Sequence, residues 1–320
     1  MNLSIRLLQK NELTIADDVF RLAFGTFIGL PQPRDFLGDA SYIANRWQMD
    51  PTAAFAAEVD GKLVGSNIAA NWGSVGTFGP LSVHPDYWNQ KIAQQLVEAV
   101  ITRFTQWGIQ QAGLFTFPNS PKHHALYQKF GFYPRFLTFI MAKELPSPPP
   151  DLAATVTNSP STKFSGLNSQ QQADCLKACA QLTDAIYSGL DLSREIEAVH
   201  SQNLGDTVLL WDDTGLAGFA ICHCGTGSEA GSNVCYVKFA AVRPGLTAGE
   251  QFETLLTLCE TYGANQNMRR LVAGVNTSHD EAYRRMVDRQ YRTEIVGVAM
   301  HRPNDSGYNR ADVFVLDDWR

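Results

Sequence analysis

One segment of the chain has the residues and spacing of an anion-binding site. Residues 81–96 read as a strand that ends near Val83, a short loop, and a helix that begins near Ile92. The first N–H groups of a helix have no partner within the helix, and the helix dipole adds positive potential there. Lys91 adds a positive charge at this point. The pattern predicts a site suited to a pyrophosphate, although a plain strand–helix connection would look the same.

The same half of the chain carries two short motifs. The strand before the loop ends in Val83-His84-Pro85, and a later helix ends in Tyr-Gln-Lys-Phe-Gly-Phe at residues 127–132. In order, spacing and context these motifs resemble those of the GNAT superfamily of N-acetyltransferases, which use acetyl-CoA. The resemblance covers most of residues 1–145.

The phosphate loop departs from the family pattern, which is Arg/Gln-x-x-Gly-x-Gly/Ala. Trp88 stands at the Arg/Gln position and Lys91 at the first glycine, whereas Ala93 fits the last position. A lysine adds a Cβ where the backbone must approach phosphate, but its charge could offset part of that loss. The departures bear on affinity more than on fold.

The resemblance implies which residues hold acetyl-CoA. The cofactor would lie in a cleft between two splayed strands, with strand backbone along the pantetheine arm and the loop around the pyrophosphate. The implied contacts are Leu81, Ser82 and Val83 on the strand, Asn89, Gln90, Lys91, Ile92, Ala93 and Gln94 on the loop, and Asn119, which is displaced by one position from the family's asparagine. No metal is expected.

The resemblance also implies that Tyr127 protonates the departing CoA thiolate. A phenol suits this role because it is a neutral donor with a pKa near that of the leaving thiol. The plainer alternative is that the ring only packs at the end of its helix. The acetyl group would pass directly to a primary amine, since every cysteine lies in the second half and none could carry an acyl group in the first.

The group that accepts the proton of the amine is open at this point. Many relatives have a glutamate early in the strand before Val-x-Pro, but Thr77 stands at about that place. The candidates in the first half are His84, His123, His124 and Glu58. Histidine titrates close to neutral pH, as a base should, although a lone histidine is more often a surface or capping residue.

Hydrophobic periodicity predicts the elements that position these groups. Strands are expected at residues 4–8, 54–59, 63–71, 75–83, 114–117 and 135–143, and helices at 14–30, 92–104 and 121–130. The Asp-Gly pair at residues 60–61 predicts a hairpin turn. Hairpin strands followed by strand–helix–strand–helix–strand indicate an α/β (α+β mixed) fold, with a largely antiparallel mixed sheet flanked by helices.

The second half of the chain repeats this pattern 159 residues later. Val242 falls on Val83, and Met300 falls on Met141. A period this long predicts two copies of a whole domain. The expected division is a catalytic domain at 1–145, a Pro-rich linker at 146–165 and a second GNAT-like domain at 166–320. Helices are expected within 169–201 and at 249–262 and 281–289, and strands at 207–211, 216–222, 234–242, 271–275 and 294–301, with a weak first strand at 162–166 and a final strand within 314–320.

The second copy is expected to be degenerate. Glu250 falls on Lys91, which places a carboxylate where phosphate would lie. Met286 falls on Tyr127, which removes the proton donor. Tyr283, one helical turn earlier, could replace it, though core packing is the simpler role. One working site and one structural copy are therefore expected.

Composition limits the partners. The net charge is −6 and no run of Lys or Arg stands out, which argues against nucleic acid or an anionic membrane. The expected partner is a small-molecule or peptide amine, with a mild preference for a cationic one, and a homodimer is compatible with the sequence. The cytoplasm is the expected compartment, since no apolar run is long enough to cross a bilayer and the start lacks a signal-peptide pattern.

Two other functions stay open. Both copies could be catalytically silent, in which case the protein would bind acyl-CoA or another small molecule without turnover; the atypical phosphate loop favours this alternative. The two domains could also form an interaction scaffold without a ligand. Cys222 and Cys224 do not predict a metal site, because His223 between them points to the opposite face of a strand.

Overall fold

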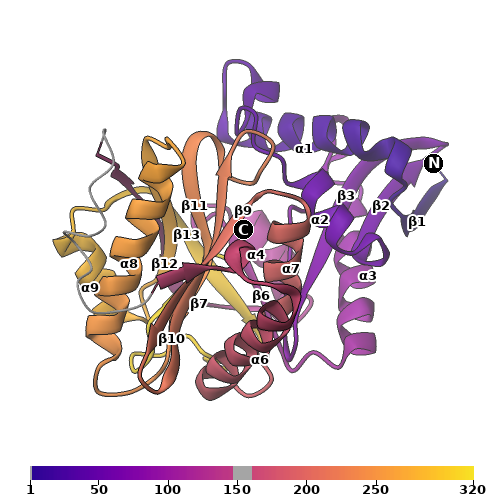
Figure 1. Cartoon of the computed structure of the whole chain (residues 1–320). Helices are drawn as coiled ribbons and strands as arrows, with labels where there is room; N and C mark the ends of the chain where they lie inside the picture. Colours follow the sequence, from indigo (N-terminus) through magenta and orange to yellow (C-terminus); the bar gives the residue numbers. More distant parts are fainter. Residues whose placement is uncertain (1, 147–160) are drawn as a thin grey trace.

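The computed structural model describes residues 2–146 and 161–320. In these residues the strands form one 14-stranded, mostly antiparallel sheet, with helices on both of its faces (Figure 1). The predicted fold class is therefore confirmed. The helices are α1 (Leu13–Ile28), α2 (Ile43–Met49), α3 (Ile92–Trp107), α4 (Pro121–Gln128), α6 (Ser169–Ile186), α7 (Ser193–Ser201), α8 (Ala248–Asn265) and α9 (Asp280–Asp288). The strands are β1 (Leu3–Leu7), β2 (Ala54–Val59), β3 (Lys62–Trp72), β4 (Val75–Phe78), β5 (Ser82–Val83), β6 (Gln111–Thr116), β7 (Tyr133–Glu144), β8 (Ser161–Lys163), β9 (Gly205–Asp212), β10 (Gly215–Gly225), β11 (Gly231–Val242), β12 (Arg270–Asn276), β13 (Arg292–Arg302) and β14 (Val315–Leu316).

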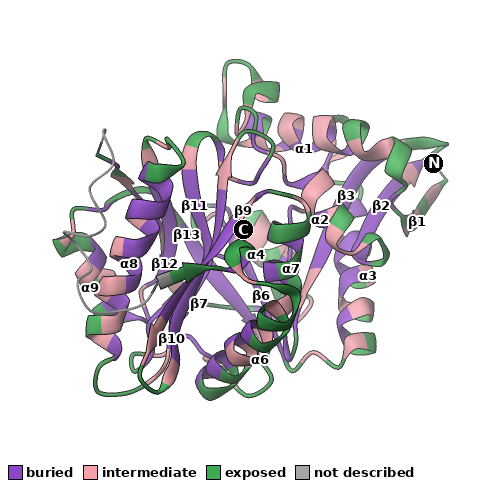
Figure 2. Cartoon of the chain, in the orientation of Figure 1, coloured by how far each residue is buried: buried purple, intermediate pink, exposed green. Residues whose placement is uncertain are grey.

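Strand β2 shows how the sequence builds the layers. Side chains of a strand alternate between the two faces of its sheet. Ala54 and Ala56 pack beneath α1 and α2, whereas Phe55 and Ala57 pack against α3. Both faces are thus buried, and the strands stay buried through the middle of the molecule (Figure 2).

The strand predicted at residues 75–83 is wrong as a single element, because the structure divides it into β4 and β5. Gly79 and Pro80 separate the two. Proline has no N–H to donate to a ladder, so pairing stops at this point. The break leaves β5 paired with β3 alone.

Each half of the chain contributes a strand to the other. The central strand order is β6-β13-β7-β12, so β13 lies between β6 and β7, and β7 lies between β13 and β12. Without the second half, β6 and β7 would both lose β13 as a neighbour, and without the first half, β12 and β13 would both lose β7. The pattern of the sequence did not predict this exchange.

The second half follows the element order of the first. Shifted by 159 residues, α4 would begin at residue 280 and β7 at residue 292, where α9 and β13 begin. The division at 146–165 stays a prediction, and most of the predicted linker, residues 147–160, lies outside the described residues.

Candidate functional site

The sheet opens between β5 and β6. Strand β4 pairs in parallel with β6 from Val75 to Thr77, opposite Gln111 to Gly113. Beyond this point β5 pairs only with β3, and β6 pairs on its other side with β13. The two strands therefore diverge, and the edge of β5 that faces β6 has no partner strand among the described residues.

Backbone groups of β5 point into this opening. The N–H of His84 donates to the carbonyl of Val64 on β3. Residues of a strand alternate in the direction of their N–H and C=O groups, so those of Val83 point away from β3. The Val83 carbonyl accepts a hydrogen bond from the indole Nε1 of Trp88, at 2.6 Å.

The start of α3 lies at one end of the opening. Lys91 is the residue before the helix and has φ of 63° and ψ of 14°, and its side chain does not cap the helix. Among the described residues, no side chain therefore caps the first N–H groups of α3. Asn89 also has a positive φ, 64°. The left-handed conformation of Lys91 explains why the related motif has glycine at this position.

A cavity of about 550 Å³ joins the opening, the start of α3 and Tyr127. The predicted residues on its lining are Leu81, Ser82, Val83, Asn89, Lys91, Ile92, Ala93, Gln94 and Tyr127. Gln90 and Asn119 are exposed and do not line it. The structure thus brings together most of the residues predicted to contact acetyl-CoA, and that role stays a prediction.

Tyr127 is 7% exposed and packs among apolar residues. Its ring centroid lies 6.0 Å from that of Phe78. Burial raises the pKa of Tyr127, so the hydroxyl stays protonated at neutral pH. The hydroxyl makes no hydrogen bond to the protein in the described residues, which leaves its proton available to a ligand.

The structure separates the predicted base candidates. Glu58 lies in an ion pair with Arg6, at 2.7 Å, on β2. The Nδ1 atom of His84 accepts the backbone N–H of Asp86, and the Nε2 atom of His124 lies 3.2 Å from the Phe117 carbonyl.

His123 lies on the cavity lining. Burial, with a smaller contribution from the Lys122 charge, lowers the pKa of His123 to about 4. The imidazole is therefore neutral at pH 7 but only weakly basic. None of the other three candidates lines the cavity within the described residues.

One wall of the cavity is aromatic, and sequence reasoning missed it. Phe20, Phe24 and Phe27 lie on one side of α1 and line the cavity. The rings of Phe24 and Phe36 are stacked with centroids 5.4 Å apart, and Phe27 lies 5.0 Å from Phe117. The signal was present, because aromatic residues at i, i+4 and i+7 mark one helix face.

A buried cluster of charged side chains contacts the cavity lining at Gly79. Arg46 of α2 donates to both carboxylate oxygens of Glu229, at 2.7 and 2.8 Å, and to the Gly79 carbonyl beside the break between β4 and β5. Lys238 lies 2.8 Å from the same carboxylate. Burial alone would raise the pKa of Glu229, but Arg46 and Lys238 outweigh it and lower the pKa.

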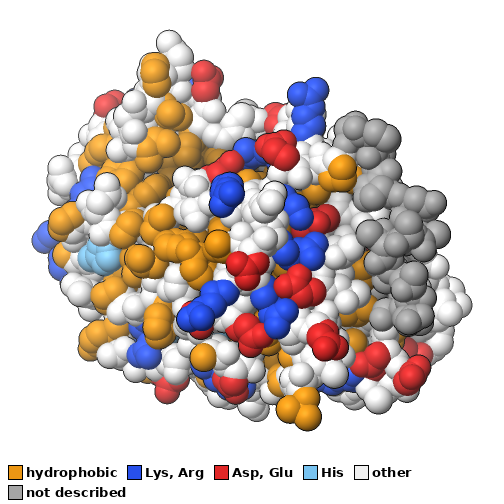
Figure 3. Space-filling view, turned by 90° about the vertical axis from the view of Figure 1, so that its left-hand side faces the viewer, with side chains coloured by type: hydrophobic (Ala, Val, Ile, Leu, Met, Phe, Trp, Pro, Cys, Tyr) orange, Lys and Arg blue, Asp and Glu red, His pale blue; other side chains and the backbone are white. Residues whose placement is uncertain are grey.

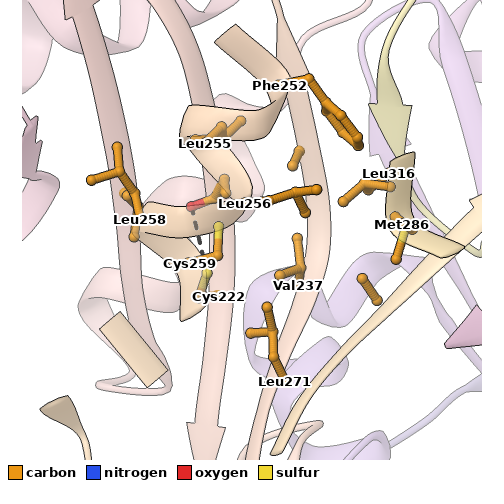
Figure 4. Packing of buried hydrophobic residues seen from close by; sticks show 14 of the residues in the cluster. Cys222, Val237, Phe252, Leu255, Leu256, Leu258, Cys259, Leu271, Met286 and Leu316 are labelled. Atoms are coloured by element: carbon orange, nitrogen blue, oxygen red, sulfur yellow. Dashed lines mark hydrogen bonds between the residues drawn. The ribbon is translucent and has the colours of Figure 1, made fainter. Parts of the chain in front are cut away.

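In the second half, the corresponding opening is filled by the chain itself. Strands β11 and β12 pair in parallel only as far as Val237 and Ala273. Beyond this point β14 pairs with β11, with Ala240 opposite Leu316 and Ala241 opposite Val315. The Leu316 side chain lies in the core near Met286, the counterpart of Tyr127 (Figure 4).

The start of α8 also differs from the start of α3, because its charge and its surroundings are different. Glu250 is exposed there, and the guanidinium of Arg285 packs against Gly249. Arg285 is paired with Glu281 at 2.6 Å. Tyr283 packs on Phe139 rather than facing an opening, with ring centroids 5.3 Å apart.

The described residues contain neither a metal-binding cluster nor a helix that could span a membrane. No group of His, Cys, Asp or Glu there has the arrangement of a metal site. Cys222 is buried in the core beneath α8, close to Cys259 (Figure 4). None of the helices in this part of the chain has the length and apolar character to cross a membrane.

Residues 19–132 match the model of the acetyltransferase (GNAT) family. The match includes the opening between β5 and β6, the start of α3 and Tyr127. This part of the chain is therefore similar to GNAT domains, and this similarity supports an acyltransferase-type function.

Solved structures with this fold extend over the whole chain. A proposed acetyltransferase from Pyrococcus horikoshii is 13% identical, with a TM-score of 0.68 over 99% of this chain and 95% of that chain. A GCN5-related N-acetyltransferase from Sphaerobacter thermophilus is 16% identical, with a TM-score of 0.60 over 94% of this chain and 95% of that chain. At these identities the likeness shows the fold. A search of curated proteins gives no match.

Proposed function

We propose that this chain is an acetyl-CoA-dependent N-acetyltransferase that acts in the cavity of its first half. The observation that carries the proposal is the meeting of three features in that cavity: the edge of β5 that no described strand pairs, the start of α3 that no described side chain caps, and Tyr127. A strand edge can pair with the amides of a pantetheine arm, and a helix start suits a pyrophosphate. Acetyl-CoA would supply an acetyl group activated as a thioester.

The residues of the chain would position the acetyl-CoA thioester and protonate the departing sulfur. The nitrogen of a primary amine forms a bond to the acetyl carbon, and the carbon–sulfur bond breaks. Tyr127 gives its proton to the sulfur and recovers one from solvent, while the amine proton leaves through water. Burial raises the pKa of Tyr127, but the same apolar surroundings also make a thiolate more basic, so transfer between them stays feasible.

A second candidate function is a binding module without turnover. Its support is the indole of Trp88, which already occupies the Val83 carbonyl that would otherwise face a pantetheine amide. Lys91, in its left-handed conformation, also gives phosphate less room than glycine would. Both observations would weaken the binding of acetyl-CoA in the orientation that catalysis needs.

Calorimetric titration and turnover with the full chain separate the two functions. We expect acetyl-CoA and CoA to bind with one equivalent per chain, and a panel of primary amines to give an acetylated product by mass spectrometry. Binding without any acetylated amine supports the module. An absence of binding contradicts both.

A further inference from the structure

The aromatic wall of the cavity is continuous. Phe24 and Phe27 of α1 connect it to Phe36 on one side and to Phe117, at the end of β6, on the other. Phe24 and Phe27 are half-buried, so their rings are held by the protein and still face the cavity. On the face drawn in Figure 3, hydrophobic side chains gather into a broad area with a histidine at its margin. Flat, rigid rings of this kind bind another ring by offset or edge-to-face stacking.

The charges beside this wall are positive. The Nζ atom of Lys122 lies 4.5 Å from the ring centroid of Trp88 and 5.5 Å from that of Phe27. Lys91 contributes a second ammonium to the described lining, and Arg320, also on the lining, is paired with Asp318 at 2.9 Å. The faces of the Trp88 and Phe27 rings are thus already in contact with a cation, the Lys122 ammonium. A substrate ammonium would therefore meet the like charge of Lys122 beside these rings.

We infer that the acceptor is an aromatic amine that is uncharged at neutral pH, that is, an arylamine. The inference rests on the proposed function and names the acceptor class of the same site. The ring would stack on Phe24 and Phe27, and the neutral amine would cost little to desolvate. Net charge alone had favoured a cationic acceptor, but the local charges of the lining decide otherwise.

The chemistry of an arylamine also fits the weak base in this cavity. The lone pair of the neutral nitrogen is free to form the bond to the acetyl carbon, so no proton has to be removed beforehand. The surplus N–H proton of the product nitrogen passes to water, and the sulfur takes the Tyr127 proton. An aliphatic amine is almost fully protonated at pH 7, as lysine is, and would first need a stronger base than His123.

The test compares three acceptors with acetyl-CoA and the full chain: 4-methylaniline, 4-methylbenzylamine and spermidine. At pH 7 we expect kcat/KM for 4-methylaniline to exceed that for the other two by at least about tenfold. Between about pH 6 and pH 8, kcat/KM for 4-methylbenzylamine should rise about tenfold per pH unit, following its neutral fraction, while that for 4-methylaniline stays nearly flat. A preference for spermidine or 4-methylbenzylamine at pH 7 overturns the inference.

A pair of variants on α1 localises the effect. Phe27→Asp places a carboxylate beside Lys122, so the preference for 4-methylaniline over 4-methylbenzylamine should fall at least about tenfold. Ile15→Asp, at an exposed position of the same helix away from the cavity, should leave the preference unchanged. Phe24→Leu keeps apolar volume but removes the stacking ring, so KM for 4-methylaniline should rise about threefold to tenfold with kcat unchanged.

Titration of CoA accompanies every assay. If CoA binds and spermidine is the better acceptor, the acceptor class is wrong and the proposed function stands. If CoA binds and no amine of the panel is acetylated, the acceptor class is wrong and the binding module gains support. If CoA does not bind, both proposals fail together.

Discussion

The two halves of this chain open their sheets at corresponding points and fill the openings differently. In the first half, β5 and β6 diverge around a cavity of about 550 Å³. In the second half, β11 and β12 diverge in the same way, and β14 lies in the gap, paired with β11. A gap between splayed strands is thus a cavity or a part of the core, depending on which groups pair with its backbone.

Hydrogen bonding explains why neither gap can stay dry and unfilled. Buried backbone N–H and C=O groups without partners are costly. Val315 and Leu316 supply partners to Ala240 and Ala241, and the N–H of Val242 donates to the Phe314 carbonyl. In the first half the indole of Trp88 is the partner of one such group, the Val83 carbonyl. The second gap has therefore become structural.

The largest effect is expected from shortening the Leu316 side chain, which lies in the core at the second gap. Leu316 is 1% exposed, so Leu316→Ala should lower the free energy of unfolding by about 2–5 kcal/mol, measured by urea denaturation. Leu246→Ala, at a fully exposed position, should change it by less than about 0.5 kcal/mol. CoA affinity of the folded Leu316 variant should match wild type, because the proposed CoA site lies in the other half. A large loss of CoA affinity would show that the second gap takes part in binding.

The next effect concerns the tyrosine that the second half lacks. Tyr127→Phe keeps the ring but removes its proton, so kcat should fall about 10²-fold, and kcat/KM by a similar factor, with acetyl-CoA affinity and Tm near wild type. The assay follows release of CoA with an amine that the wild type acetylates.

The matched control for Tyr127→Phe is Met286→Leu, at the corresponding position of the second half. Met286 is buried in the core, and a swap of similar volume there should leave turnover unchanged. Full activity of Tyr127→Phe would show that Tyr127 only packs, and that water protonates the thiolate.

A smaller effect separates the two helix starts. Lys91→Glu at the start of α3 should weaken CoA binding by about 1–3 kcal/mol at low salt, or about tenfold to a hundredfold, because a carboxylate would face the pyrophosphate. Glu250→Lys at the start of α8 should change nothing, and both variants should still bind one CoA per chain by calorimetry. Saturation at two per chain in any of these proteins would contradict the comparison.

Local patterns in the sequence predicted most of the elements. The helix at 121–130 and the hairpin around residues 60–61 follow from proline, glycine and periodicity, and the structure has them as α4 and the turn between β2 and β3. The break at Gly79 and Pro80 was readable too, since proline seldom continues a ladder, but the apolar run on both sides concealed it. The short helix α2 has too few turns to give a clear period.

What the sequence did not predict depends on contacts between distant segments. No local pattern in β13 predicts that it pairs with β6, because the residues of β13 are compatible with a place in the sheet beside strands of either half. The filled gap depends on β14, which begins at Val315, 78 residues after the last β11 residue that pairs with β12, and no periodicity encodes this pairing. The aromatic wall was predictable from Phe20, Phe24 and Phe27, yet such spacing more often marks a buried helix face than a cavity.

The smallest effect tests the backbone at the first helix start. Lys91 has φ of 63°, in the left-handed region where a Cβ is disfavoured and glycine is not. Lys91→Gly should therefore raise the free energy of unfolding by about 0.5–1 kcal/mol, measured by urea denaturation without ligand, even though glycine loses more entropy on folding. Asn89 has nearly the same φ, 64°, but asparagine tolerates this region, so Asn89→Gly should change stability by only a few tenths of a kcal/mol, or about 0.3. If Lys91→Gly is destabilising, the lysine side chain makes contacts in the free protein that outweigh its backbone strain, and Lys91 then has a structural role in addition to the electrostatic role proposed for it.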